Sequence, residues 1–536
     1  MKRVLLVILP LILFGSCYKE AKKKIDRIHG VKWSGTYAIS AINADLNLDD
    51  AVEIFSGPAN TGAYFDKTIY FAYEATEISK TGSQLYPLND QNGTTSAALT
   101  NPEKATLTGA GSVTTNRSFV FPFVMTGIPE LDSVYFSKGN FSLAFQNNYD
   151  HPCTVTLKIV QARRKNSGSP DLIYNLNVGS RATGNINDSL SNIILDATKG
   201  GTGFNELRMD LSITYTNSGA GIGISDNFNI NYNLNSLQFS RIYGYFGNLS
   251  VLNANDSLSL DIFDQGLKYG TFRFDDPKLK LIYTHNMGMP FQLKTNSLSG
   301  YKPAGTTPVV GYPATTAISE IPFGSEGNFI TDSVVISHPS SNIQTVIKNE
   351  PTHILYNFNV IPNPGGPVKR NFVLANSTFK VKVMMELPLN GLATKVLLID
   401  TTDFDLNAGK ASEVIDWVNF RMNIHNEIPI TLGFQAYFMD ANSLILDSLF
   451  EPFRYIANSA TIDGSGNVIA PYDEIYDVYL EKDKIQNIQN AKKLMFKAFM
   501  NTAESGGTQV PVRITQNQHL KVKMGIHTKV AVNEKF

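Results

Sequence analysis

The chain has few cysteines, few tryptophans and few charged residues for its length. Two of the 536 residues are cysteine, two are tryptophan, and 17% are charged. The 46 basic residues nearly balance the 47 acidic ones. A surface that binds nucleic acid needs a clustered basic excess, so we expect no nucleic-acid partner.

Familiar catalytic and metal-binding motifs are also missing from the sequence. It contains no G-x-S-x-G, no H-E-x-x-H and no glycine-rich phosphate loop. Residues 45–50 resemble the start of a calcium loop, but Asp50 stands where Gly is needed and Ser56 where Glu is needed. His285 and His425 recur at equivalent positions without a second ligand nearby, which favours a role in turns. We predict a non-enzymatic protein without a metal or cofactor, and an enzyme is the least favoured alternative.

The first residues have the pattern of an export signal. Lys2 and Arg3 precede an apolar run over residues 4–14, which is short for a permanent membrane span. The sequence Phe-Gly-Ser-Cys that ends at Cys17 resembles the bacterial lipobox, although Phe14 departs from the usual Leu. The resemblance implies a signal peptide over residues 1–16 and a covalent lipid on Cys17. Each buried methylene of the lipid contributes roughly 0.8 kcal/mol to membrane binding. The alternative is an ordinary signal peptide with an unmodified cysteine.

The same resemblance points to a location. Tyr18 replaces the Asp that is associated with inner-membrane retention, and the Asn-, Phe- and Tyr-rich chain is similar to outer-membrane lipoproteins of Bacteroidota. We therefore expect anchoring to the outer membrane by lipid, with a tether over residues 17–32. The basic stretch at residues 19–24 leaves the periplasmic and cell-surface faces both open. With Cys17 acylated, Cys153 has no disulfide partner, and we expect it to be a small buried residue.

The composition of the remaining chain favours strands. There are 32 Phe and 23 Tyr, accompanied by many Asn, Thr and Ser. Residues 141–159, 279–294 and 420–434 share one pattern: apolar residues alternate, an Asn closes the run, and a Pro and a second alternating run follow. The prolines Pro152, Pro290 and Pro429 are 138 and 139 residues apart. The pattern predicts a strand, a tight turn and a strand, forming a hairpin that is repeated in three modules.

Other segments recur in the same order. A closing strand is expected at residues 380–384 and again at 521–525, and short helices are expected after residues 191, 341 and 484. We predict a mainly β protein of three tandem antiparallel β-sandwich-like modules with short helices. The modules are expected at residues 33–250, 251–395 and 396–536, with an insertion near 56–132 in the first. The alternative is a curved sheet wrapped around a helix such as residues 485–500.

One aromatic cluster is a candidate binding site. It lies within the insertion expected for the first module and consists of Tyr64, Phe65, Tyr70, Phe71 and Tyr73. Exposed aromatic rings stack on sugar rings, so these residues are candidates for contacts with a glycan. Packing in a core is the competing interpretation, because most of the Phe and Tyr must be buried somewhere.

The sequence thus predicts an architecture and a location more clearly than a chemistry. We expect a lipid-anchored, multi-domain β protein of the bacterial envelope that acts as a binding, adhesion or scaffold component. Its partners would be the membrane, through the N-terminal lipid, and an envelope protein or glycan. One alternative is a glycan-binding accessory lipoprotein of a polysaccharide-uptake system, and another is a carrier of lipid or another hydrophobe.

Overall fold

The computed structural model describes residues 33–47, 60–168, 171–198, 201–263, 269–367, 370–403, 415–451, 454–505 and 507–532. Most of these residues lie in antiparallel strands, which confirms the predicted mainly β class. The helices are short: α3 (Gly82–Leu85), α4 (Asn101–Ala110), α5 (Ile343–Lys348) and α7 (Lys482–Ile488). The predicted signal peptide, Cys17 and the tether lie outside the described residues.

Sandwich A comprises the described residues within 86–246, and the ranges given below for sandwiches B and C likewise refer to described residues only. Its first sheet contains β5 (Gln91–Ala97), β7 (Glu130–Asn147), β9 (Ala162–Arg164), β11 (Thr183–Ser189), β12 (Ile193–Asp196) and β14 (Phe228–Tyr245). Its second sheet contains β6 (Ser112–Pro122), β8 (Cys153–Ile159), β10 (Leu172–Val178) and β13 (Glu206–Thr216).

Sandwich B comprises residues 60–85 and 247–389. Its first sheet contains β2 (Asn60–Ala63), β3 (Ile69–Glu74), β4 (Ile78–Thr81), β17 (Lys278–His285), β21 (Ile330–Ile336) and β24 (Thr378–Pro388). Its second sheet contains β15 (Leu252–Ser259), β18 (Phe291–Lys302), β19 (Gly305–Pro308), β20 (Thr315–Ile318) and β22 (His353–Pro362).

Sandwich C comprises residues 33–47 and 390–532. Its first sheet contains β1 (Trp33–Asn47), β26 (Ile415–Asn426), β32 (Tyr472–Glu481) and β37 (His519–Val532). Its second sheet contains β25 (Asn390–Asp403), β27 (Ile430–Met439), β28 (Ile445–Ser448), β29 (Arg454–Ala457), β33 (Lys493–Thr502) and β36 (Val512–Arg513). Two small ribbons complete it: β30 (Thr461–Ile462) with β31 (Val468–Ala470), and β34 (Glu504–Ser505) with β35 (Thr508–Gln509).

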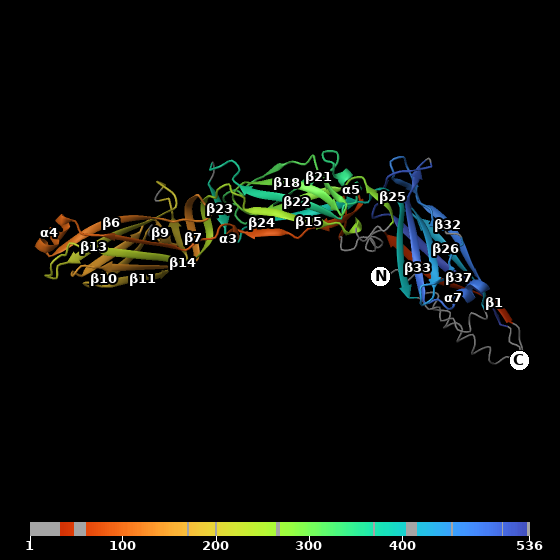
Figure 1. Cartoon of the computed structure of the whole chain (residues 1–536), viewed down its shortest axis with the longest axis horizontal. Helices are drawn as coiled ribbons and strands as arrows, with labels where there is room; N and C mark the ends of the chain where they lie inside the picture. The colour runs from red at the N-terminus through yellow and green to blue at the C-terminus, as the bar shows by residue number, and fades with distance from the viewer. Residues whose placement is uncertain are drawn as a thin grey trace.

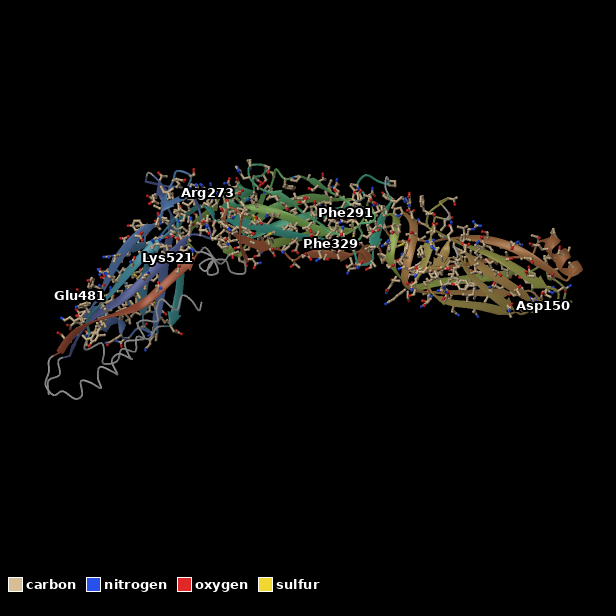
Figure 2. All side chains as sticks on the ribbon, turned by 180° about the vertical axis from the view of Figure 1, so that it is seen from behind. Asp150, Arg273, Phe291, Phe329, Glu481 and Lys521 are labelled. Carbon is tan, nitrogen blue, oxygen red and sulfur yellow. The ribbon has the colours of Figure 1, made fainter. Side chains whose placement is uncertain are left out.

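The three sandwiches lie end to end in an extended molecule (Figure 1). Sandwich A forms one end, with α4 at its tip, and sandwich C forms the other. Asp150 of sandwich A and Glu481 of sandwich C mark these opposite ends in Figure 2. Strand β1, the first described strand, pairs along its length with β37, the last, from Trp33 beside Val532 to Asn47 beside His519.

The sandwiches are nested in sequence. The chain forms β1 in sandwich C, then β2–β4 in sandwich B, then all of sandwich A, and returns through B to finish C. Sandwich A is thus inserted between β4 and β15 of sandwich B, and both are inserted between β1 and β25 of sandwich C. Surface connections in β-domains tolerate such insertions because lengthening a loop adds little closure entropy.

One pairing pattern recurs in all three sandwiches. The first sheet has the order β5-β14-β7-β11 in A, β3-β24-β17-β21 in B and β1-β37-β26-β32 in C. The second sheet has β6-β13-β8-β10 in A, β15-β22-β18-β20 in B and β25-β33-β27-β28 in C. The predicted closing strands at residues 380–384 and 521–525 are equivalent, because they lie in β24 and β37.

The pairing differs from the predicted consecutive modules, which are not confirmed. The module expected at residues 33–250 is divided, since β1 lies in sandwich C, β2–β4 lie in sandwich B and only the remainder forms sandwich A. The insertion expected near residues 56–132 contributes β3 and β6 to two different cores. Sequence spacing detected the repeat, but it cannot show that one unit interrupts another.

The repeated strand–turn–strand segments are not hairpins. Strands β7 and β8 lie in different sheets of sandwich A, and the same holds for β17 and β18 in B and β26 and β27 in C. Each turn therefore carries the chain from one layer of a sandwich to the other. The alternating pattern identified the strands correctly, but a tight turn between two strands does not specify whether they pair.

A buried Asn holds this turn in sandwich A. Asn147 closes β7, and its Oδ1 accepts a hydrogen bond from the Tyr149 N–H at 3.0 Å. Its Nδ2 donates to the carbonyl oxygens of His151 at 2.8 Å and Gly179 at 2.9 Å. One amide thus satisfies three backbone groups that leave the sheet, and buried backbone groups must be paired.

The equivalent Asn in sandwich C makes the same contacts. The Oδ1 of Asn426 accepts from the Ile428 N–H at 2.9 Å, and its Nδ2 donates to the carbonyl oxygens of Ile430 at 3.1 Å and Asn458 at 2.7 Å. In both sandwiches the Asn Nδ2 donates to the carbonyl oxygens of the residues that follow it by four and by 32 positions in the chain. The recurring Asn is therefore a structural element of the turn.

Of the three short helices expected, those after residues 341 and 484 are confirmed as α5 and α7, whereas the one after residue 191 is replaced by a strand. Residues 193–196 form β12, because this segment pairs with β7 and β9. The helix expected over residues 485–500 ends at Ile488, and β33 begins at Lys493. Ile485 and Ile488 of α7 and Leu494 of β33 are buried in the core of sandwich C, and α7 has only 7 residues, so the alternative of a sheet wrapped around a helix is wrong.

Neighbouring sandwiches share sheets. Strand β23 (Asn371–Leu374), which follows β22 of sandwich B, pairs with the end of β14 in sandwich A. Strand β16 (Tyr269–Phe274), which follows β15, pairs with β25 in sandwich C. At the first joint Arg370 also forms ion pairs with Glu130 and Asp132. Backbone ladders therefore join the sandwiches at both junctions, and ion pairs add to the first.

We predict that Asn147→Ala destabilises sandwich A by about 3 kcal/mol, because three backbone groups lose a buried partner. The neighbouring exposed Gln146→Ala is the control and should change the stability by less than about 0.5 kcal/mol. Hydrogen exchange of the β7 and β8 amides, measured with urea unfolding, reports the change. Equal effects of the two substitutions would contradict the role assigned to the turn.

Candidate functional site

The aromatic residues singled out from the sequence divide between core and surface. Phe71 and Tyr73 are 4% exposed and lie in the hydrophobic core of sandwich B. Tyr64 and Tyr70 are half-buried and contact each other with ring centroids 4.6 Å apart. Phe65 is fully exposed in the loop between β2 and β3. The five residues therefore do not form one continuous stacking surface.

Tyr64 is held in place by charged groups. Its Oη donates a hydrogen bond to Oε2 of the buried Glu386 at 2.7 Å, and the Nζ of Lys278 lies 4.3 Å from its ring centroid. Burial raises the pKa of Tyr64, and the Glu386 carboxylate raises it further. Glu386 also pairs with Lys280. One ring face is covered by an ammonium group, which leaves Phe65 as the ring of this cluster most accessible to a ligand.

Cys153 is buried at the start of β8 and is 4% exposed. Burial raises the pKa of its thiol to about 12, so the thiol stays protonated at neutral pH. A protonated thiol is a poor nucleophile and a poor metal ligand. These properties match the expectation of a small buried side chain.

The two histidines at repeated positions have different environments. His285 ends β17 at the place where Asn147 ends β7, and its Nδ1 accepts a hydrogen bond from the Met287 N–H at 3.3 Å. His425 instead lies on the face of sandwich C, where it contacts Asp473 at 2.7 Å and Glu427 at 3.2 Å. Its pKa is raised, chiefly by the hydrogen bond to Asp473. The expected turn role thus describes His285 only.

Within the described ranges, no group of three or more His, Cys, Asp or Glu residues is arranged to hold a metal ion. Among the same residues, no helix is long and apolar enough to cross a membrane.

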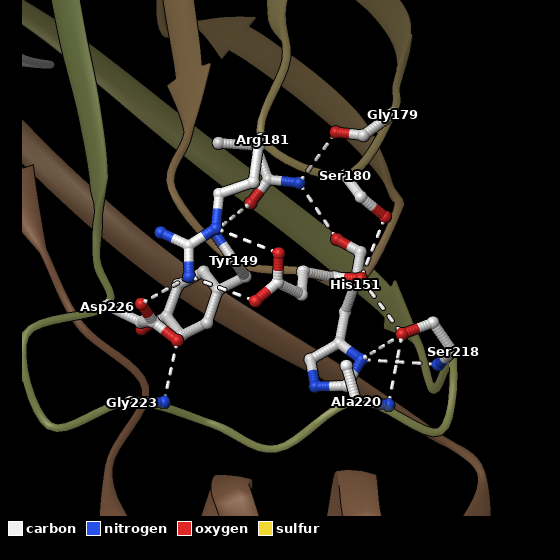
Figure 3. A network of polar contacts seen from close by, with 11 residues as sticks. Tyr149, His151, Gly179, Ser180, Arg181, Ser218, Ala220, Gly223 and Asp226 are labelled. Atoms are coloured by element: carbon white, nitrogen blue, oxygen red, sulfur yellow. Dashed lines mark hydrogen bonds and ion pairs between the residues drawn. The ribbon is translucent and has the colours of Figure 1, made fainter.

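The far end of sandwich A carries a network of polar contacts (Figure 3). Three loops meet there, and Arg181 from the β10–β11 loop is central to them. Its guanidinium binds both carboxylate oxygens of Asp150 at 2.9 and 3.0 Å and Oδ1 of Asp226 at 3.0 Å. Oδ2 of Asp226 accepts from the Gly223 N–H at 2.7 Å. The Asp150 carboxyl has a lowered pKa, because Arg181 binds its charged form.

The network continues to the buried His151. The carbonyl oxygen of Asp150 accepts hydrogen bonds from the hydroxyls of Ser180 and Ser218, both at 2.8 Å. Ser218 also donates its N–H to Nδ1 of His151 at 3.2 Å. These contacts fix the loop that presents Ile224, which is 99% exposed. No pattern in the sequence indicates this arrangement, because Arg181 lies 31 and 45 positions from its two acidic partners.

The tip is further braced by α4. Thr100 caps this helix, and Glu103 completes the capping box by accepting from the Thr100 N–H at 2.7 Å. Glu103 also pairs with Arg117 of β6 at 2.8 Å, and its pKa is lowered to about 2 because these hydrogen bonds outweigh its desolvation. The end of sandwich A is therefore a fixed surface of several loops.

Comparisons with known proteins give only remote similarities. No protein family matches the chain, and no curated protein matches it in sequence. A protein from Parabacteroides distasonis that is assigned as secreted has 11% identity over 54% of this chain and 88% of its own, with a TM-score of 0.26. The tandem CBM22 domains of Paenibacillus barcinonensis Xyn10C have 10% identity over 52% of this chain and 82% of their own, with a TM-score of 0.13. Similarities this weak support no argument about function.

His285 should make the stability of sandwich B depend on pH. Burial lowers its pKa to about 4, against about 6.5 for an exposed imidazole. The unfolded chain thus binds a proton that the folded chain excludes, and the stability present above pH 6.5 falls as the pH drops toward 4. The loss amounts to about 3 kcal/mol.

His285→Asn, which introduces the residue found in the other two turns, should remove this dependence. The exposed His527→Asn should leave it unchanged. Urea unfolding between pH 4 and 7, with hydrogen exchange of β17 and β18, measures the effect. A pH dependence that is the same in both variants would show that another group is responsible.

Proposed function

We propose that the protein is a lipid-anchored rod of the bacterial envelope that presents sandwich A to a partner, as a binding, adhesion or scaffold component. The supporting observation is that β1 and β37 share a sheet at one end of the molecule while sandwich A forms the other end (Figure 1). A lipid on Cys17 would precede β1 by only a short tether. The anchor would therefore hold sandwich C at the membrane, on either face of the outer membrane.

The length of the rod suits such a role. Sandwiches whose strands contain about twelve residues extend roughly 40 Å each, because a strand rises about 3.3 Å per residue. Three of them end to end would span up to about 120 Å, and somewhat less because sandwich C is inclined to the line of A and B (Figure 1). The shared sheets at both joints support a stiff connection, so the position of sandwich A would be maintained.

The alternatives receive different support. A glycan-binding accessory role is favoured by exposed Phe65 beside Tyr64, with a further surface considered below. Lipid carriage has less support, because large apolar side chains fill the space between the sheets. The proposal includes no catalytic activity and no cofactor other than the lipid on Cys17.

The anchor is tested by substitution of the acylated residue. In cells labelled with radioactive palmitate, the wild-type chain should incorporate label and fractionate with membranes, whereas Cys17→Ser should do neither. Cys153→Ser is the matched control and should be labelled normally. Label retained in Cys17→Ser would rule out the lipid anchor at this position.

The rod is tested separately in solution. Small-angle X-ray scattering of the chain from residue 17 onwards with Cys17→Ser should give a maximum dimension of about 100 Å or more. The value should not change with salt, because the joints are formed mainly by backbone hydrogen bonds. A compact particle would contradict the display of sandwich A away from the anchor.

A further inference from the structure

We propose that the outward face of the first sheet of sandwich A binds an uncharged, extended polysaccharide. This inference rests on the proposed function, in which sandwich A is displayed to a partner, and it names the ligand that sandwich A would bind. Four strands form the face, in the order β5-β14-β7-β11. We call it the amide face.

Strand β14 supplies the centre of the amide face. Between Phe228 and Asn235 its residues alternate, so that Asn229, Asn231, Asn233 and Asn235 point outward while the apolar residues between them are buried. Side chains on one side of a strand repeat every second residue. The sequence Phe-Asn-Ile-Asn-Tyr-Asn-Leu-Asn thus builds a row of four amides on a buried apolar base.

The neighbouring strand β7 continues the pattern. Gln146, Ala144, Ser142 and Asn140 stand opposite these four Asn residues in an unbroken register. The bulges of this strand pair begin only after Asn235, so the register of the amide face is regular. Regular pairing sets the rows about 4.8 Å apart across the strands.

The outer strands add residues of the same kind. Asn92, Thr94 and Ser96 of β5 pair with β14, and Asn185 and Asn187 of β11 pair with β7. The other outward positions of β11 are a Thr and a Ser. Every position of this four-strand array is therefore Asn, Gln, Ser or Thr, with a single Ala.

The corresponding faces of the other sandwiches have a different character. In sandwich B the equivalent positions include Lys280 and Lys382, and in sandwich C they include Arg421, Asp477 and Lys523. Protein surfaces ordinarily intersperse charges of both signs. The same fold thus carries charged faces in two copies and an uncharged one in the copy farthest from the proposed anchor.

This composition limits the class of ligand. Nucleic acids and anionic membranes require basic residues, and the array has none. Protein interfaces are enriched in Tyr, Trp, Met and Arg at their centre and depleted in Ser, and the array has none of the enriched types. An amide offers both a donor and an acceptor, which matches the hydroxyl groups of a neutral sugar chain.

The side-chain amides of the array are also accessible to a ligand. Among the described residues, one hydrogen bond joins two side chains of the array. It runs from Nδ2 of Asn229 to Oε1 of Gln146, at 3.3 Å. Asn231, Asn233 and Asn235 are exposed and make no side-chain contact of that kind among the described residues. Because the sheet fixes the backbone and the spacing of these residues, binding a ligand would cost side-chain entropy but little backbone entropy.

The test uses unlipidated protein, the chain from residue 17 onwards with Cys17→Ser, in affinity electrophoresis. Gels containing a neutral polysaccharide such as hydroxyethyl cellulose, dextran or xylan should retard the protein, while gels containing polygalacturonate should not. The double substitution Asn231→Ala with Asn233→Ala should weaken binding about tenfold, as expected for loss of several hydrogen bonds. Asn423→Ala, an exposed Asn on the equivalent sheet of sandwich C, is the matched control and should bind normally.

The isosteric change Asn231→Asp adds a charge without removing bulk, and circular dichroism establishes that each variant is folded. The Asn231→Asp substitution should weaken binding to a neutral polymer, because an uncharged ligand does not compensate for the desolvation of the new carboxylate. Retardation by none of the three neutral polymers, retardation by polygalacturonate alone, or equal loss in Asn423→Ala would overturn the proposal. Sedimentation that shows self-association lost in Asn231→Asp would also overturn it, by identifying a second copy as the partner. None of these results would affect the tests of the anchor or the rod.

Discussion

Strand pairing across an insertion is the constraint on which the structure depends. The first sheet of sandwich C is completed only when β1 meets β37, although almost the whole chain lies between them. The first sheet of sandwich B is completed when β3 meets β24, with all of sandwich A between them. An inserted domain can satisfy this condition only if its own ends lie close together. The end of sandwich A that joins B provides this, through β14 and the segment that leads into β5.

The same constraint explains the extended shape. Each insertion leaves its host at one end, so the inserted sandwich extends the molecule along its axis instead of packing on a sheet face. Both broad faces of each sandwich remain outside these joints. The added ladders β14–β23 and β16–β25 then join each pair of neighbours by hydrogen bonds, which favours a fixed geometry. Nesting therefore accounts both for the rod and for its continuous connection.

The repeated fold separates structural from functional residues. Asn147 and Asn426 stabilise the equivalent turns with the same three hydrogen bonds. His285 occupies the equivalent position in sandwich B and makes one of these bonds, the one from the N–H two residues later. Residues that recur in this way are explained by the turn. The features that differ among the copies are the network around Arg181, the exposed Phe65 and the uncharged array of sandwich A. A function specific to one end of the molecule would depend on such differences.

Local patterns in the sequence determined much of this protein. Alternating apolar residues located strands such as β7, β17 and β26, and the spacing of Pro152, Pro290 and Pro429 indicated three related units. The alternating Asn residues of β14 were equally visible in the sequence, but their meaning depends on the neighbours that pairing supplies. Periodicity depends on a residue and its near neighbours, and for that reason it can be read without a structure.

Only the tertiary structure decided which strands pair. The repeated segments were expected to be hairpins, yet each connects two sheets, because the same turn serves both arrangements. Residues 33–47 were expected in the first module, yet β1 pairs with β37 at the opposite end of the chain. Arg181 meets Asp150 and Asp226 only because three loops converge at one end of sandwich A. Such contacts arise from hydrogen bonds and packing between residues far apart in the chain, and no local pattern encodes them.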